Sequence, residues 1–297
     1  MEERINEKNL SSKALQYLIV MQTNKYKNTI FSLEGKNALV IGGLGQIGIN
    51  SVKILLDAGA AVEILDIETE FDNERAKELK SLYRKNNLIF SKINITNEEE
   101  VNKKIKKTSK NLGSIDILIN HAHFKGDSKL LKPHSQFFAS FENYPFDVWK
   151  QTIDVNLNGL FLITKAVGTL MKKNKSGVII NTASTYGIVS PNKSIYEDSG
   201  INSPVTYAVT KAAIINFSRY LATHWADYNI RVNTLSPGGV VNPGQSDNFK
   251  KNYSKLTPLN RLSKENEYQG AILFLASSAS SYMTGSNLII DGGWTAW

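Results

Sequence analysis

The 297-residue chain contains no cysteine. This absence excludes a disulfide framework, a thiolate metal site and a cysteine nucleophile, and it fits a reducing compartment. Long apolar runs are missing too, because none approaches the roughly 20 residues that cross a membrane. The first residues, MEERINEKNL, are acidic and polar where a secretion signal would be basic and then apolar. We therefore expect a cytoplasmic protein with no membrane partner.

Positive charge is in excess, with a formal net charge of +8. The densest basic run is NKKIKKTSK, residues 102–110, and Val101, Ile105 and Leu112 recur around it at helical spacing. These lysines therefore cover the solvated face of an amphipathic helix. No aromatic residues alternate with them, so the stacking platform that binds single strands is missing. We expect no nucleic-acid partner, although the charge helps to attract phosphorylated ligands.

The chain divides into an extension and one domain. Residues 1–35 hold one short amphipathic stretch, ALQYLIVMQ, and are otherwise polar, which indicates a flexible arm or a docking helix; Met21 is an alternative start. Residues 36–297 alternate short β-rich apolar runs with helical patterns, and no linker or repeat divides them. The β-rich runs are continuously apolar, so helices cover both sheet faces. This predicts a single-domain Rossmann-type α/β fold, a doubly wound parallel sheet of about seven strands.

Glycines follow the first β-rich run at Gly42, Gly45 and Gly48. They let the backbone approach a pyrophosphate, and the helix N-terminus behind them offers free N–H groups. No G-K-[ST] follows, which argues against a P-loop nucleotidase. Asp66 ends the second run, where a carboxylate accepts hydrogen bonds from the adenosine ribose and repels a 2′-phosphate. The sequence thus favours NAD over NADP; the competing interpretation of Asp66 is a merely polar strand end.

The stretch PVTYAVTKAA places Tyr207 four residues before Lys211. Such pairs share a face of any helix, so the spacing alone decides nothing. The chemistry is nevertheless suggestive, because a tyrosine with its usual pKa of about 10 is a poor base at neutral pH. An ammonium group one turn away stabilises the phenolate and lowers that pKa.

From about residue 31 to residue 297 the chain resembles the short-chain dehydrogenase/reductase family. The resemblance rests on the glycine loop, LINHAH, VNLNG, Ser184 after GVIINTA, Tyr207 with Lys211, RVNTLSPGGV and LIIDGGW. It implies an NAD(P)-dependent enzyme that interconverts a secondary alcohol and a ketone. By the same resemblance Tyr207 is the acid/base, Lys211 tunes it and holds the ribose, Ser184 binds the substrate oxygen, and Asn156 supports a proton-relaying water. Thr182 and Thr185 compete for the role of Ser184.

The cofactor contacts that the resemblance implies come from each strand end in turn. They are Gly42, Gly45, Gln46, Ile47, Gly48, Asp66, Asn94, Ile95, Asn120, Ala122, Tyr207, Lys211, Pro237, Gly238 and Val240.

Three features depart from the family pattern. Gln46 stands where common single-domain members carry glycine, and NHAH replaces N-N-A-G, which brings His121 and His123 beside the cofactor ribose. Two histidines without a third ligand do not predict a metal site. Ser184 and Tyr207 lie 23 residues apart, and the insertion SPNKSIYEDSG between them contains Tyr196, a rival base. Glycine, not lysine, stands four residues after Tyr196, so Tyr207 is favoured and the insertion is expected to shape the substrate mouth.

The insertion and the ending DGGWTAW resemble a subgroup with flagellin-modification and gluconate-5-dehydrogenase-like proteins. A sugar, amino sugar or polyol is therefore the expected substrate, with a loop at about 242–262 closing over it. The alternative is a non-catalytic dinucleotide-sensing regulator, which would not need Tyr207 and Lys211.

The resemblance also implies a homodimer or homotetramer, in which the helices that carry Asn156 and Tyr207 pack against their copies. The apolar residues Leu160, Phe161, Ile215 and Phe217 on these helices could equally serve the internal core.

Overall fold

The computed structural model describes residues 26–68, 73–83, 87–124, 126, 132–197 and 199–297. The predicted amphipathic stretch at 14–22, with Met21, lies outside these residues. The part of the extension that is described packs on the domain, because Leu33 is buried and Tyr26 and Phe31 contact the same core. The Ser278 hydroxyl also donates a hydrogen bond of 2.8 Å to the Ile30 carbonyl. Within the described residues no helix is long and apolar enough to cross a membrane.

The predicted parallel sheet is confirmed. Seven strands lie in the order β3-β2-β1-β4-β5-β6-β7, and every neighbouring pair is parallel. The order reverses between β1 and β4, which is where sheets of this type bind their ligands. The strands are β1 (Asn37–Ile41), β2 (Ala61–Asp66), β3 (Leu88–Lys92), β4 (Ile117–Asn120), β5 (Gly177–Thr182), β6 (Ile230–Pro237) and β7 (Asn287–Ile290).

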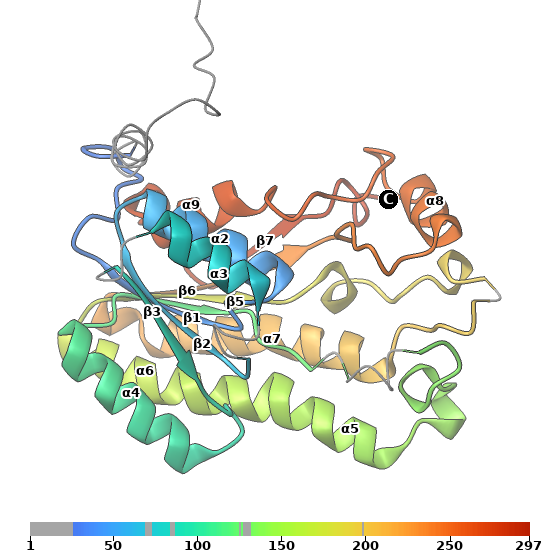
Figure 1. Cartoon of the computed structure of the whole chain (residues 1–297), viewed down its shortest axis with the longest axis horizontal. Coiled ribbons are helices and arrows are strands. Elements are labelled where there is room, and N and C mark those ends of the chain that lie inside the picture. The colour runs from blue at the N-terminus through green and yellow to red at the C-terminus, as the bar shows by residue number, and fades with distance from the viewer. Residues whose placement is uncertain (1–25, 69–72, 84–86, 125, 127–131, 198) are drawn as a thin grey trace, which may run out of the picture.

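Helices cover both faces of the sheet (Figure 1). One layer contains α2 (Gln46–Asp57), α3 (Glu74–Leu82) and α9 (Gln269–Ala276), and the other contains α4 (Glu98–Leu112), α6 (Leu160–Asn174) and α7 (Val205–His224). A separate apolar core fills each side, which explains why the strands are apolar on both faces. Helix α8 (Asp247–Lys255) stands beyond the sheet, within the segment expected to be a loop.

The basic run lies on the solvent face of α4, as its spacing predicted. Val101 and Ile105 are buried against the sheet, together with Thr108, whereas Leu112 is only partly buried. The Asn97 side chain caps the first turn by accepting from the Glu100 N–H at 3.0 Å. The lysines thus need no ligand to explain them.

The helical stretch between β4 and β5 is interrupted. Helix α5 (Phe146–Ile153) passes through a π-helical turn, η4 (Asp154–Gly159), into α6. At Gly159 a Cβ atom would approach the Ile95 side chain to 2.7 Å, so the helix can pass there only with glycine. Such wider turns often mark functional positions, and Asn156 sits inside this one.

Candidate active site

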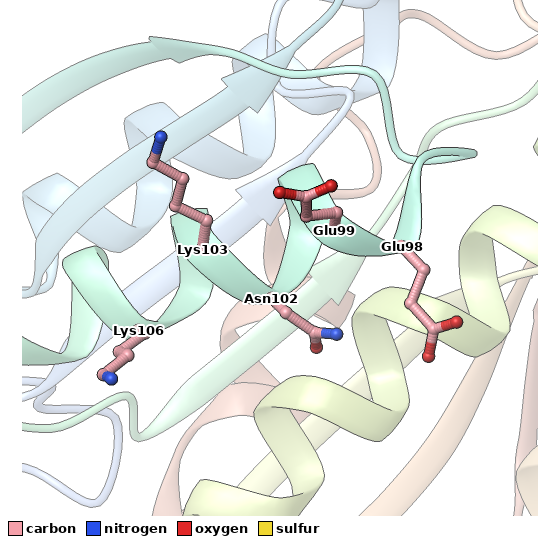
Figure 2. Close-up of a pocket in the computed structure, with 5 residues that line it drawn as sticks. All are labelled: Glu98, Glu99, Asn102, Lys103 and Lys106. Carbon is pink, nitrogen blue, oxygen red and sulfur yellow. The ribbon is translucent and has the colours of Figure 1, made fainter.

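A cleft of about 1110 Å³ opens at the carboxyl ends of the strands, around the point where the strand order reverses. It runs from the glycine loop and Asp66 to Tyr207 and on to Tyr253 in α8. A second hollow, of about 720 Å³, lies on the outer face of α4 between Glu98 and Lys106. Figure 2 shows its side chains pointing away from one another. We place the functional site in the cleft because most of the predicted site residues line it.

The glycine loop fits a pyrophosphate. Gly42 has a φ of +72°, and a Cβ atom there would lie 2.7 Å from the Ala122 nitrogen; at Gly48 a Cβ atom would lie 2.2 Å from the Gly42 carbonyl oxygen. Helix α2 begins directly behind, with Gly45 as an N-cap that has no side-chain partner and no acidic residue in the first turn. Its free N–H groups and positive dipole end therefore remain available for an anion.

Asp66 closes the loop at the other side. Its Oδ2 accepts from the Leu44 N–H at 3.0 Å and its Oδ1 from the Glu68 N–H at 3.2 Å. Burial raises the pKa of Asp66, while these backbone hydrogen bonds act to lower it. Glu68 and Arg75 line the same end, and the guanidinium of Arg75 lies 3.4 Å from Glu265. This end of the cleft thus carries the Asp66 and Glu68 carboxylates together with the Arg75 guanidinium.

The other end of the cleft holds the proposed proton-transfer residues. One turn of α7 brings Tyr207 and Lys211 to the same wall, and Ser184 lies opposite, directly after β5. Burial raises the pKa of Tyr207, and the hydrogen bond from Ser184 acts to lower it. Lys211 is buried, and burial lowers its pKa to about 8. These three groups can bind an alcohol oxygen and exchange its proton.

Lys211 is anchored to the backbone beside Tyr207. Its ammonium donates to the Thr182 carbonyl at 2.8 Å and lies 5.7 Å from the centre of the Tyr207 ring. The expected lowering of the Tyr207 pKa by this ammonium stays a prediction.

Two predicted side chains do not line the cleft. Asn156 accepts from the Phe124 N–H at 2.6 Å and donates to the Thr210 hydroxyl at 3.0 Å, so it ties the loop after β4 to α7. Asn120 donates to Asn181 at 2.8 Å inside the sheet–helix layer. Both brace the site from behind.

His121 and Tyr196 have other partners than those first considered. The two ring nitrogens of His121 contact the Ser51 hydroxyl at 2.9 Å and the Thr182 hydroxyl at 2.8 Å, which leaves neither free for a metal. The described residues contain no cluster of three or more side chains that could hold one.

Tyr196 lines the cleft, and burial raises its pKa. Its ring packs against Phe249, at 5.6 Å between ring centres.

Most of the predicted residues do meet in this cleft. The following line it: Gly42, Gly45, Gln46, Ile47, Gly48, Asp66, Asn94, Ile95, Ala122, Ser184, Tyr207, Lys211, Pro237, Gly238 and Val240. Sequence reasoning missed His123 as a neighbour of the Tyr207 ring, at 6.3 Å, and missed Tyr186, Phe249 and Tyr253. Tyr186 follows Ser184 closely, so the sequence could have indicated it as a cleft residue. No local sequence pattern indicates Phe249 and Tyr253 of α8. Gln46 acquires a role, because its amide donates to the Val241 carbonyl at 2.5 Å.

A glycine loop at the switch point of a parallel sheet, followed by a buried Tyr–Lys pair and a serine, defines a nicotinamide-dinucleotide-dependent oxidoreductase. The chain belongs to the short-chain dehydrogenase/reductase family. The family model described as enoyl-(acyl carrier protein) reductase matches residues 45–295. The chain is 34% identical over 278 residues to sorbose reductase SOU1 of Candida albicans, covering 90% of this chain and 89% of that protein.

Solved structures agree with this assignment. A short-chain dehydrogenase of Leptospira borgpetersenii with bound NAD+ has 36% identity and a TM-score of 0.76, covering 91% of this chain and 96% of that one. A gluconate 5-dehydrogenase of Burkholderia cenocepacia in complex with NADP and tartrate has 28% identity and a TM-score of 0.77, covering 90% and 98%.

Proposed function

We propose that the protein is an NAD(H)-dependent dehydrogenase that interconverts a secondary alcohol and a ketone on a sugar, amino sugar or polyol. The observation that carries the proposal is the convergence of Ser184, Tyr207 and Lys211 at one end of a cleft whose other end holds Asp66. The likeness to a sorbose reductase and to a gluconate 5-dehydrogenase supports the substrate class. It also supports the gluconate-5-dehydrogenase-like part of the subgroup resemblance.

In this proposal each of the predicted catalytic residues has a part in one proton transfer. The Ser184 hydroxyl orients the substrate oxygen, and Tyr207 takes the hydroxyl proton while hydride leaves the carbinol carbon. A dinucleotide held by the glycine loop and Asp66 would supply the hydride acceptor, so that the alcohol would be oxidised and the nicotinamide reduced. Lys211 keeps positive charge near the developing phenolate. Asn156 holds the loop after β4 and α7 in register, and a water beside it is our proposed route for the proton.

Cofactor choice is proposed from the adenosine end of the cleft. Asp66 presents a carboxylate to the adenosine ribose and would repel a 2′-phosphate. NAD should therefore bind at least ~10-fold more tightly than NADP, a difference in binding free energy of ~1.4 kcal/mol. Fluorescence titration of both cofactors tests this preference. Asp66→Asn should reduce it, whereas Asp227→Asn, an exposed carboxylate after α7 and outside the cleft, serves as the control. Equal or tighter binding of NADP by the unaltered protein would contradict the proposal.

The substrate class is tested by a screen of sugars, amino sugars and polyols with NAD, followed by absorbance of the reduced nicotinamide. Turnover on a polyol but not on simple secondary alcohols is the expected result. The competing function, a cofactor-sensing regulator without catalysis, would bind NAD through Asp66 and turn over none of them. Retention of Tyr207, Lys211 and Ser184 in the cleft favours the enzyme.

A further inference from the structure

His121 occupies the first position after β4, next to Asn120, and the two side chains serve different contacts. Asn120 reaches Asn181 of β5, whose own amide donates to Ser218 of α7 at 2.9 Å. His121 reaches α2 through Ser51 and β5 through Thr182. Neighbouring residues of a strand point to opposite faces. The strand end is thus bound to helices of both layers by two adjacent side chains.

The tautomer of the imidazole follows from the bond that Ser51 makes. When the Ser51 hydroxyl donates its single proton to the Ile47 carbonyl, 3.1 Å away, it can only accept toward His121. Nε2 of His121 therefore carries a proton, and Nδ1 is left to accept from the Thr182 hydroxyl at 2.8 Å. This arrangement uses a neutral ring in one tautomer.

The surroundings keep the ring neutral. Burial lowers the pKa of His121 to about 3, and the charges of Lys211 on α7 and His123 in the following loop act in the same direction. Ser51 on α2 and Thr182 on β5 are the groups that touch its nitrogens, and neither titrates. A charged ring would break the bond from Thr182, because both nitrogens would then be donors.

Thr182 connects this arrangement to the proposed chemistry. Its side chain donates to His121, and its backbone carbonyl accepts the Lys211 ammonium at 2.8 Å. Ser51 and Ile47 belong to α2, whose N-terminus faces the cleft. Three hydrogen bonds, two of His121 and one of Lys211, thus connect that helix to the catalytic lysine, with Thr182 as the residue that joins them.

We propose that His121 is a positioning residue, a neutral clamp that fixes the carbonyl anchor of Lys211 relative to the helix behind the glycine loop. The inference rests on the proposed function, because it assigns His121 to the same proton-transfer site. It gives the departure from the family's N-N-A-G pattern a role, with Ser51 and Thr182 as the partners that the ring needs.

Two substitutions distinguish a positioning role of His121 from a contribution to folding alone. Thr182→Val removes the hydroxyl at nearly constant volume and keeps the carbonyl that Lys211 uses, and His121→Phe keeps a ring without either nitrogen. Each should lower kcat by about 10–100-fold, the range expected from small displacements of reacting groups. The double variant should be little worse than either single one, because both break the same path. His224→Gln, an exposed histidine at the end of α7, is the control.

The decisive readout is the pH profile of turnover, measured well below each variant's unfolding temperature. If the clamp sets the Lys211 environment, the ionisation near pH 8 shifts in both variants and not in the control. Loss of thermal stability with unchanged kcat and unchanged profile would overturn the proposal. Thr182→Val supplies the answer if His121→Phe fails to fold.

Nuclear magnetic resonance with 15N-labelled histidine tests the role of His121 independently of the proposed enzymatic function. The chain has four histidines, so the signal lost in His121→Phe identifies His121. We expect a neutral ring protonated at Nε2 down to about pH 5. A charged ring or the Nδ1-protonated tautomer at neutral pH would overturn the clamp, whether or not the screen finds a substrate. A protein that shows the expected tautomer but turns over no alcohol would refute the proposed function alone.

Discussion

At the residue scale, burial shifts the pKa values of Tyr207 and Lys211 in opposite directions. It raises the pKa of the phenol and lowers that of the ammonium to about 8, so the lysine is the first of the two to lose its proton. Phenol with ammonium is therefore the dominant state below about pH 8, and phenol with amine above it. The state that oxidises an alcohol, phenolate with ammonium, contains the same number of protons as phenol with amine.

This pairing predicts opposite pH profiles for the two directions. Oxidation needs one proton on the pair, so kcat/KM for the alcohol should fall about tenfold per pH unit below the lower pKa, which lies at about 8. Reduction needs both protons, so its kcat/KM should fall as the pH rises through the same value. Steady-state profiles in both directions check this. An oxidation profile that is flat from about pH 6 to 9 would contradict it.

The assignment of the base makes a second prediction. Tyr207→Phe should lower kcat by ~10²–10⁴ and leave the Kd for NAD nearly unchanged, because the phenol acts on substrate. Lys211→Ala should weaken NAD binding as well as turnover, since the family role of this lysine includes the ribose. Tyr196→Phe is the matched control, with the same atom removed from a tyrosine in the same cleft. Turnover that survives in Tyr207→Phe but not in Tyr196→Phe would reassign the base.

At the element scale, the strands were predictable and the helices around the site only partly. Continuous apolar runs such as residues 38–41 can be read without tertiary information, because both faces of those strands are buried. The π-helical turn at Asn156 could not be read, since it depends on the fit of Gly159 against Ile95 from another strand end. Helix α8 was missed because its apolar contacts lie in the insertion, which local periodicity does not reveal.

The insertion and α8 form one unit over the substrate end. The Asn252 amide donates to the Glu197 carboxylate at 2.5 Å, and Phe249 packs against Tyr196. Tyr253 stacks on Trp294 at 4.3 Å and accepts from the Gly239 N–H at 2.6 Å. The insertion therefore serves as a platform for the helix as well as a wall of the cleft.

This unit should govern substrate affinity. Phe249→Ala removes an aromatic contact worth ~0.5–1.5 kcal/mol, so KM for the alcohol should rise about 2–10-fold with little change in the Kd for NAD. Lys251→Ala, exposed on the same helix, should change neither constant. Initial-rate kinetics on the alcohol found by the screen provide the measurement. An unchanged KM in Phe249→Ala would show that α8 does not contact the substrate.

At the scale of the whole molecule, the distribution of charge bears on cofactor binding and the exposed apolar surface bears on self-association. The net charge of +8 is distributed over solvent faces such as that of α4, which fits attraction of an anionic cofactor and no specific partner. The apolar surface is more selective. Of the four residues considered for self-association, Leu160 and Ile215 are buried in the internal core and Phe217 packs against it. Phe161 remains 49% exposed.

Self-association through α5, α6 and α7 is therefore our last prediction. Phe146, Phe161, Val209 and Tyr220 expose large apolar groups on these helices, a concentration typical of interfaces. We expect a homodimer or homotetramer at micromolar concentration by light scattering, against 33.0 kDa for one chain. Phe161→Glu should shift the mass toward the monomer, because a carboxylate is costly to bury without a partner. Phe141→Glu, at a phenylalanine that is more exposed than Phe161 but lies outside these helices, should leave the mass unchanged. A monomeric unaltered protein would refute the prediction.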